Sequence, residues 1–215
     1  MGFEKMSKLS AILLFFFFAA SSASGQMLKY DVVKGNKTLG KMTVERQSYN
    51  NEVEYHIKSK VVFRILFSFT VDFECTALYR DNILESESTV NKLNGSSQKA
   101  SELVRDGDNY FHTLNDLTTT EKGPIDYTIA AIYFQEPYSG QNVYSPQFGQ
   151  YLKFEEIGDH VYKMESPDGT NLYTYMNGIC TEVKVSRDFA TFYFRMAPET
   201  LYALKNGLDS TAIGN

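Results

Sequence analysis

The stretch FTVDFECTALYR, residues 69–80, decides the fold class of this chain, because its apolar and polar residues alternate almost without a break. A period of two places successive side chains on opposite faces of a β-strand. One face of this strand is therefore apolar and the other is polar, and only Leu78 departs from the pattern. The apolar face could meet a filled core, a ligand cavity or lipid. It carries Phe69, Val71, Phe73, Cys75, Ala77 and Tyr79.

The preceding stretch VEYHIKSKVVF, residues 53–63, alternates in the same way and predicts a second long strand. Its polar face carries Glu54, Lys58 and Lys60, and a short apolar corner at residues 65–67 joins the two strands. A flat open sheet of such long strands would leave its edges exposed, so we expect a strongly curved antiparallel sheet. A membrane barrel would need an apolar outer band. The charges on this face exclude one, and we expect no integral membrane protein.

Turn residues recur between further strand-like segments, as is typical of antiparallel β proteins. The exception is GPIDYTIAAIYFQEP, which predicts a short helix at residues 126–135 because its apolar residues have helical spacing between two prolines. The sequence therefore predicts an all-β, barrel-like or clam-like domain of long curved strands, with one short helix between a set of seven strands and a set of five. The expected strands are 28–34, 40–47, 52–63, 69–80, 83–93, 99–105, 109–114, 150–156, 160–165, 170–175, 180–186 and 188–196.

The N-terminal residues have the three parts of a secretory signal peptide. Two lysines precede an apolar run at residues 11–20, and small residues that include Ala23 and Gly25 follow. The run is about half of the ~20 residues that a membrane-spanning helix needs, so an uncleaved anchor is the weaker alternative. We expect cleavage before Gln26 and release into the periplasm or the medium. The chain then divides into a signal peptide at 1–25, a β domain at 26–198 and a C-terminal tail at 199–215 with one helical turn.

Composition narrows the function classes. The 215-residue chain has a formal net charge of −5, and no strand concentrates Lys and Arg. Nucleic-acid binding needs a concentrated basic surface, so we expect none. The chain is long enough to bury a stable hydrophobic core without disulfide bonds or a structural metal ion. In an oxidising periplasm Cys75 and Cys180 could form one disulfide; two buried free thiols are the alternative.

Several features together resemble a family of exported bacterial proteins of unknown function. These features are Tyr30-Asp31-Val32-Val33 followed by Leu39-Gly40-Lys41-Met42, the long paired strands, Asp126 before the expected helix, and the final FATFYFRM. The resemblance spans about residues 28–198. It implies a single-domain barrel-like or clam-like β fold and an envelope location. It implies no activity, because the family has no settled catalytic residues.

No catalytic motif stands out. The sequence contains no G-x-S-x-G, phosphate-loop, His-x-x-x-His or Cys-x-x-Cys pattern. His56, His112 and His160 fall on or beside different strands and are interpreted as solvated surface residues, because a metal site would need three such ligands to converge. Asp72 and Glu74 share a strand face, but their even spacing on a polar face favours solubilising charges over an acid–base pair. We expect no catalysis, no metal and no cofactor.

Aromatic residues remain, with 15 Tyr, 16 Phe and no Trp in the chain. Aromatics commonly fill β cores, but about twelve curved strands enclose more space than the side chains of an eight-strand barrel fill. We predict an exported protein that binds or carries a lipophilic small molecule or lipid, with the expected helix and the loop at 138–149 closing one end. The alternative is a non-catalytic module that docks an envelope protein. The candidate cavity-lining residues are Tyr55, Ile57, Phe69, Val71, Phe73, Tyr173 and Tyr175.

Overall fold

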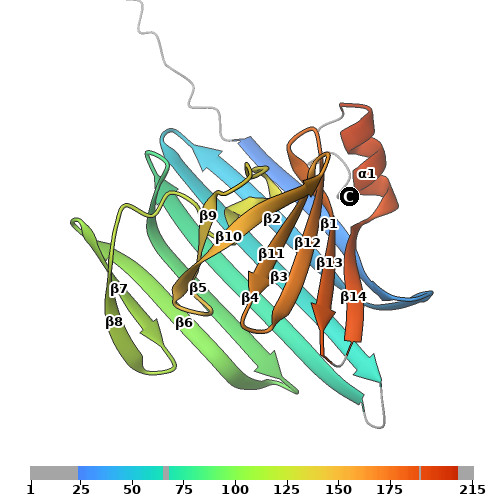
Figure 1. Cartoon of the computed structure of the whole chain (residues 1–215), viewed down its shortest axis with the longest axis horizontal. Coiled ribbons are helices and arrows are strands. Elements are labelled where there is room, and N and C mark those ends of the chain that lie inside the picture. Colours follow the sequence, from blue (N-terminus) through green and yellow to red (C-terminus); the bar gives the residue numbers. More distant parts are fainter. Residues whose placement is uncertain (1–23, 65–67, 189, 208–215) are drawn as a thin grey trace, which may run out of the picture.

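The computed structural model describes residues 24–64, 68–188 and 190–207. The apolar corner at 65–67 and all but the last two residues of the predicted signal peptide lie outside the described residues. The described chain is built almost entirely of strands (Figure 1). The elements are β1 (Ser24–Lys34), β2 (Lys37–Tyr49), β3 (Glu52–Arg64), β4 (Ser68–Arg80), β5 (Ile83–Leu93), β6 (Ser96–Asp106), β7 (Asn109–Leu114), β8 (Leu117–Lys122), η1 (Ala131–Tyr133), β9 (Asn142–Ser145), β10 (Gln150–Gly158), β11 (Val161–Ser166), β12 (Gly169–Met176), β13 (Ile179–Arg187), β14 (Ala190–Met196) and α1 (Pro198–Lys205).

All fourteen strands belong to one antiparallel sheet, in the order β8-β7-β6-β5-β4-β3-β2-β1-β14-β13-β12-β11-β10-β9. The sheet consists of two meanders that join where β1 pairs with β14, with Tyr30 opposite Met196. Within the described ranges no strand pairing links the outer strands β8 and β9, so hydrogen bonds do not close the sheet. Figure 1 shows the β9–β13 meander folded over the long strands β2–β5. The predicted all-β, barrel-like fold is confirmed.

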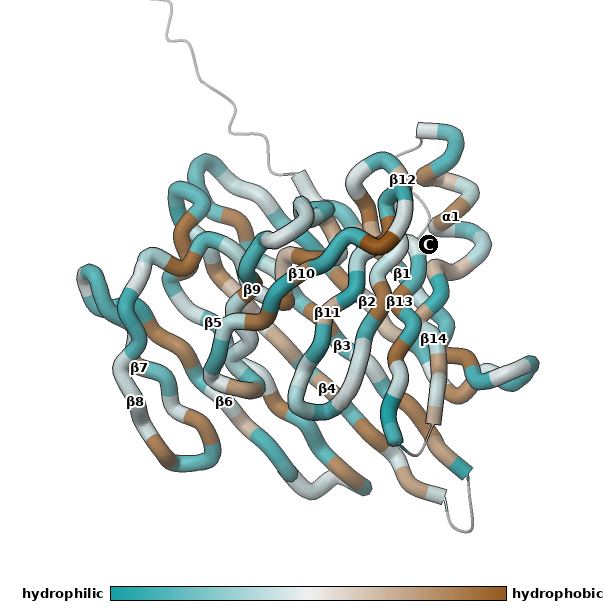
Figure 2. The backbone as a smooth tube through the Cα atoms, in the orientation of Figure 1, coloured by the Kyte–Doolittle hydropathy of each residue, from teal (hydrophilic) through white to brown (hydrophobic). Residues whose placement is uncertain are grey.

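Strand β4 contains the stretch that decides the fold class, and it pairs with β3 along its full length. Its apolar face points inward as predicted, and Cys75, Ala77 and Tyr79 are buried. On the outer face, Lys60 Nζ lies 3.7 Å from Asp72 Oδ1. A slip of one residue would exchange the two faces, so burial of the apolar face fixes the register. Figure 2 shows apolar and polar positions alternating along the long strands.

The helix predicted at residues 126–135 is much shorter than expected. This connector between β8 and β9, residues 123–135, is helical only in the 3₁₀ turn η1. Its backbone bonds to distant strands instead: the carbonyl of Ile125 accepts from Leu84 N in β5 at 2.8 Å. The carbonyl of Tyr127 accepts in the same way from β9. Carbonyls that accept from other strands are not available to the i→i+4 ladder of an α-helix.

Two strands are absent from the sequence prediction. They are β8, with the sequence LTTTEK, and the four-residue β9. Nearly all of β8 is exposed, and it lacks the apolar alternation that marks a half-buried strand. The first meander therefore has eight strands rather than seven, and the second has six rather than five. The helical turn expected in the C-terminal tail is present as α1.

Tyrosine hydroxyl groups satisfy the backbone of the connector, most of which is buried between residues 127 and 132. Tyr79 Oη donates to Thr128 Oγ1 at 2.8 Å and accepts from Thr128 N at 3.0 Å. Tyr175 Oη donates to the carbonyl of Ile132 at 2.9 Å. Loops normally run over the surface because buried backbone groups need partners. Tyr, which combines an apolar ring with a polar tip, allows this loop to pass through the interior.

We expect Tyr79→Phe to destabilise the fold, because the substitution leaves the buried N–H of Thr128 without its acceptor. An unsatisfied buried polar group costs about 1–3 kcal/mol, which urea unfolding measures directly. The control is Tyr202→Phe on α1, because the Tyr202 side chain is 64% exposed. Equal unfolding midpoints for the two variants would contradict a structural role for the Tyr79 hydroxyl.

Candidate functional site

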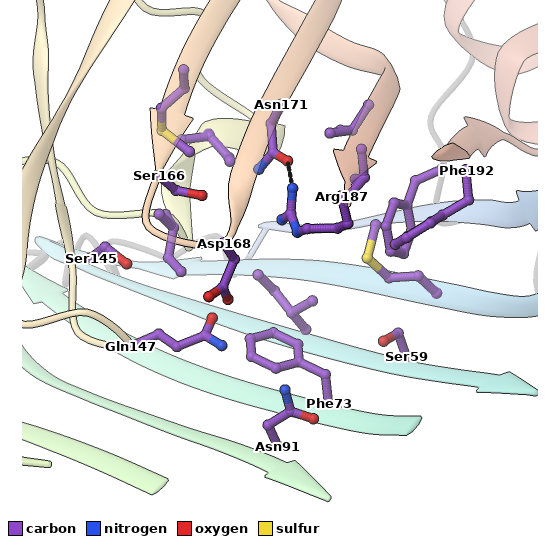
Figure 3. Close-up of a pocket in the computed structure, with 18 of the residues that line it drawn as sticks. Ser59, Phe73, Asn91, Ser145, Gln147, Ser166, Asp168, Asn171, Arg187 and Phe192 are labelled. Carbon is purple, nitrogen blue, oxygen red and sulfur yellow. Dashed lines mark hydrogen bonds between the residues drawn. The ribbon is translucent and has the colours of Figure 1, made fainter. Parts of the chain in front are cut away.

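The two meanders enclose a cavity of about 280 Å³. Strands β2–β5 supply one wall and strands β11–β14 the opposite wall, and residues from the connector and from β9 and β10 line it as well (Figure 3). The volume is near the lower end of the range for small-molecule sites. Most lining residues are aliphatic or aromatic. The polar ones are Ser59, Asn91, Ser145, Gln147, Ser166, Asp168, Asn171 and Arg187.

Four of the seven candidate lining residues lie in the wall of this cavity. Ile57 comes from β3, Val71 and Phe73 come from β4, and Tyr173 comes from β12. The structure thus brings residues from both meanders to one space, although they are up to 116 positions apart in the sequence. Contact of these side chains with a ligand stays a prediction.

The other three candidates pack beside the cavity rather than in its wall. Tyr55 meets the ring of Tyr79 edge-on at 5.7 Å between centroids. Phe69 stacks on Phe63 at 5.1 Å. Tyr175 binds the connector through its hydroxyl group. Alternation along a strand therefore identifies the inner face but does not separate the cavity from the core.

Polar side chains from several elements line the end of the cavity that lies at the turn between β11 and β12. We call this end of the cavity the mouth. Asp168 belongs to that turn, Asn171 to β12, and Arg187 to the last position of β13. Asn91 on β5 and Gln147 in the loop after β9 also line the cavity. Figure 3 shows Asp168, Gln147 and Asn91 around the ring of Phe73, with Arg187 above it. The mouth thus combines hydrogen-bonding groups from both meanders.

Arg187 is held by Asn171 on the paired strand β12 and by the backbone of its own strand β13. Its Nη1 donates to Asn171 Oδ1 at 3.0 Å and to the carbonyl of Ser186 at 2.9 Å. Gly169 has φ +126°, and a Cβ there would collide with the Ser186 carbonyl and lie 3.3 Å from Arg187 Nη1. Both the backbone conformation and the close approach require glycine at this position. The turn is therefore shaped to admit the guanidinium group.

The guanidinium group of Arg187 lacks a full counter-charge. No carboxylate of the described residues forms an ion pair with it. Burial lowers the pKa of Arg187, and the charge of Asp168 offsets this effect only in part. Among the described residues that line the cavity, these two are the only ones with formal charges. A partly desolvated cation without an ion pair is costly, which makes the mouth a candidate site for an anion.

The sequence analysis does not predict any of the mouth residues, because its candidate lining residues are all apolar or aromatic. One signal is present nevertheless. Arg187 continues the alternation of Val183 and Val185 on β13, which places a charged side chain on an inner face. Asp168 and Asn171 carry no comparable signal, because Asp and Asn are common in ordinary turns. Their position opposite Phe73 depends on how the two meanders face each other.

A second group of ionisable side chains is buried outside the cavity. Glu87 on β5 is 1% exposed. Its Oε1 accepts from Cys75 Sγ at 3.6 Å, and its Oε2 has no hydrogen-bond partner among the described residues. Burial raises the pKa of Glu87 to about 7, against smaller opposing effects of Thr128 and Cys75. Burial and the Glu87 charge also raise the pKa of the Cys75 thiol. This thiol is therefore no nucleophile at neutral pH.

Glu87 makes the protein less stable as the pH rises from about 4.5 to about 7. In this interval the unfolded chain releases the proton while the folded chain keeps it, so proton loss favours unfolding. The effect amounts to about 3 kcal/mol. Glu87→Gln should remove it, as measured by urea unfolding at about pH 5 and about pH 7.5. The matched control is Glu74→Gln on the exposed face of β4. The assignment fails if both variants keep the wild-type slope.

One histidine departs from the prediction of solvated surface residues. His56 and His160 are at the surface, where His160 Nδ1 lies 2.7 Å from Glu136 Oε1. His112 is buried, and its Nε2 lies 2.9 Å from the carbonyl of Pro146. The reason is that His112 falls on the inner face of β7, next to the gap between the outer strands. Within the described ranges no three His, Cys, Asp or Glu residues gather as a metal site.

The two cysteines are free and buried, as in the second alternative for them. Burial raises the pKa of Cys180 as it does that of Cys75. In the described part of the chain, no helix has the length and apolar character to cross a membrane. Neither observation adds a second candidate site.

Comparisons with known proteins identify the family and the fold. Residues 30–197 match the model of a domain of unknown function, DUF6134, and the chain belongs to this family. The chain is also similar to the crystal structure of a β-barrel-like protein of domain of unknown function DUF1849 from Brucella abortus. The TM-score is 0.52 at 12% identity, over 83% of this chain and 98% of that chain. This likeness shows the fold alone. No curated protein matches significantly.

Proposed function

We propose that this member of the DUF6134 family is an exported, non-catalytic protein that binds or carries a lipophilic small molecule inside its β-barrel-like domain. The cavity between the two meanders is the observation that carries the proposal. Concave, largely apolar spaces with a few polar groups are typical of small-molecule sites. Both walls consist of regular strands, so the space is part of the sheet architecture.

The inner face of β4 distinguishes this cavity from ordinary core packing. Cys75, Ala77 and Tyr79 on that face are buried, whereas Val71 and Phe73 on the same face are only half-buried and line the cavity. Apolar side chains that face empty or wet space lose dispersion contacts and hydrophobic stabilisation. A bound hydrocarbon would restore both, which supports a lipophilic ligand.

The chemistry of the wall supports binding without catalysis. Within the described residues, the lining includes three serines but no histidine, cysteine or lysine. A serine nucleophile is usually activated by an adjacent histidine or lysine, and neither is among the described residues that line this cavity. The two charged groups, Asp168 and Arg187, suit the orientation of a ligand. We therefore assign the site a binding role.

We expect 1-decanol, a neutral single-chain probe, to raise the melting temperature of the protein. A ligand at a hundred times its dissociation constant adds about 2.7 kcal/mol to the folded state. Ser59→Phe should abolish this shift, because Ser59 lies in the cavity wall and the new ring would occupy the space. Ser88→Phe, which adds the same ring on the exposed side of β5, should keep it. Differential scanning calorimetry measures all three.

Two outcomes would count against the ligand-binding proposal. In the first, neither neutral nor charged single-chain compounds shift the melting curve of the wild-type protein. In the second, Ser59→Phe and Ser88→Phe respond alike to 1-decanol. The first result would favour the alternative of a non-catalytic module that docks an envelope protein.

Export is supported by the apolar run at residues 11–20 and the small residues before Gln26. Cleavage at the expected place would remove Ser24 and Gly25, the exposed first residues of β1, and leave the rest of the strand intact. We expect the mature protein from a bacterial host to start at Gln26. Intact-mass spectrometry of the periplasmic fraction measures this. A product that retains Met1 or stays in the cytoplasm would contradict export.

A further inference from the structure

We propose that the ligand of this cavity is a single-chain amphiphile whose carboxylate head group binds Arg187 at the mouth. The inference rests on the proposed function, because both place a hydrocarbon chain in the cavity. The inference adds the chemical class of the head group. The observation behind it is a half-buried arginine without an ion pair beside an otherwise largely apolar space.

The donors of Arg187 leave one edge of the guanidinium group for a ligand. Its Nη1 uses two N–H groups, on Asn171 and on the Ser186 carbonyl. The Nε and Nη2 atoms carry three further N–H groups, and none has a partner among the described residues. Two parallel N–H groups on this edge match the two oxygens of a carboxylate. The bonds that Nη1 makes hold the fork in position before a ligand arrives.

The balance of charge favours a monoanion. Asp168 is the one acidic residue among the described lining residues, and it reduces but does not cancel the positive charge at the mouth. A phosphate monoester near neutral pH carries close to two negative charges, so repulsion by Asp168 weighs more against it than against a carboxylate. Asn91 and Gln147, which also line the cavity, can each donate an amide N–H to an oxygen that Arg187 does not hold.

The size of the cavity favours one chain. A volume of about 280 Å³ is at or below the lower limit of sites for drug-sized ligands, which is too small for the two acyl chains of a phospholipid. The aromatic rings of Phe73, Phe192 and Phe194 supply much of the wall. A single hydrocarbon chain can lie among these rings while its head group stays at the mouth.

Isothermal titration calorimetry with decanoate and 1-decanol tests the head group, because the two probes share a chain and differ in charge. Decanoate should bind the wild-type protein more tightly than 1-decanol. Arg187→Gln should weaken decanoate binding about 10- to 100-fold, as expected for the loss of a charge-assisted pair, and should weaken the binding of 1-decanol, which forms no ion pair, far less. Arg187→Lys, which keeps the charge but loses the planar fork, should fall between the two.

The matched control is Lys184→Gln, which removes a positive charge from the outer side of the same strand. It should bind decanoate like the wild type. Retained 1-decanol binding in Arg187→Gln also shows that the variant is folded. The head-group inference is overturned, while the proposed function stands, if decanoate and 1-decanol bind equally or if Arg187→Gln does not affect decanoate.

Two further results are decisive. Decyl phosphate that binds as tightly as decanoate would overturn the assignment of a carboxylate. If neither decanoate nor 1-decanol binds the wild-type protein, the proposed function fails together with the inference.

Discussion

A stretch of largely non-helical backbone runs through the inside of the curled sheet, and the rest of the structure depends on how its polar groups are satisfied. Buried N–H and C=O groups without partners are costly. Here β5 donates to the carbonyl of Ile125, and β9 donates to the carbonyl of Tyr127. Tyr79 serves both the side chain and the N–H of Thr128. The connector is thus bonded to β5 of the first meander and to β9 of the second.

This arrangement divides the interior into a filled part and an open part. The hydroxyl groups of Tyr79, Tyr110 and Tyr175 form hydrogen bonds with the backbone of the connector or with the backbone of β5. Farther along the inner face of β4, away from these contacts, Phe73 is half-buried and the cavity begins. The connector fills one part of the interior and contributes Ile129, Ile132 and Tyr133 to the lining of the cavity. Its position therefore determines where the cavity lies.

Alternation of apolar and polar residues predicts most of the strands and their inner faces, because burial in a sheet acts at a spacing of two residues. The connector was different. The spacing of its apolar residues Ile129, Ile132 and Tyr133 is helical, yet their burial comes from strands on both sides of the connector rather than from one face of a helix. Its partner Tyr79 lies 49 positions from Thr128, and such a pairing leaves no local pattern. For the same reason, strand alternation identifies four residues of the cavity wall but none of the residues at the mouth.

Arg187 links the fold to the proposed ligand. The charge of a cation at the inner end of β13 does not stabilise the fold, since burial disfavours the charged form of Arg187 and lowers its pKa. The surrounding groups nevertheless accommodate it: Asn171 accepts from it, and Gly169 at φ +126° leaves the space that it needs. Residues that hold a charge in place without neutralising it prepare a site for an opposite charge. In the proposed complex, the strands of the two meanders would contact the hydrocarbon chain of the ligand, and the β11–β12 turn with the end of β13 would contact its head group.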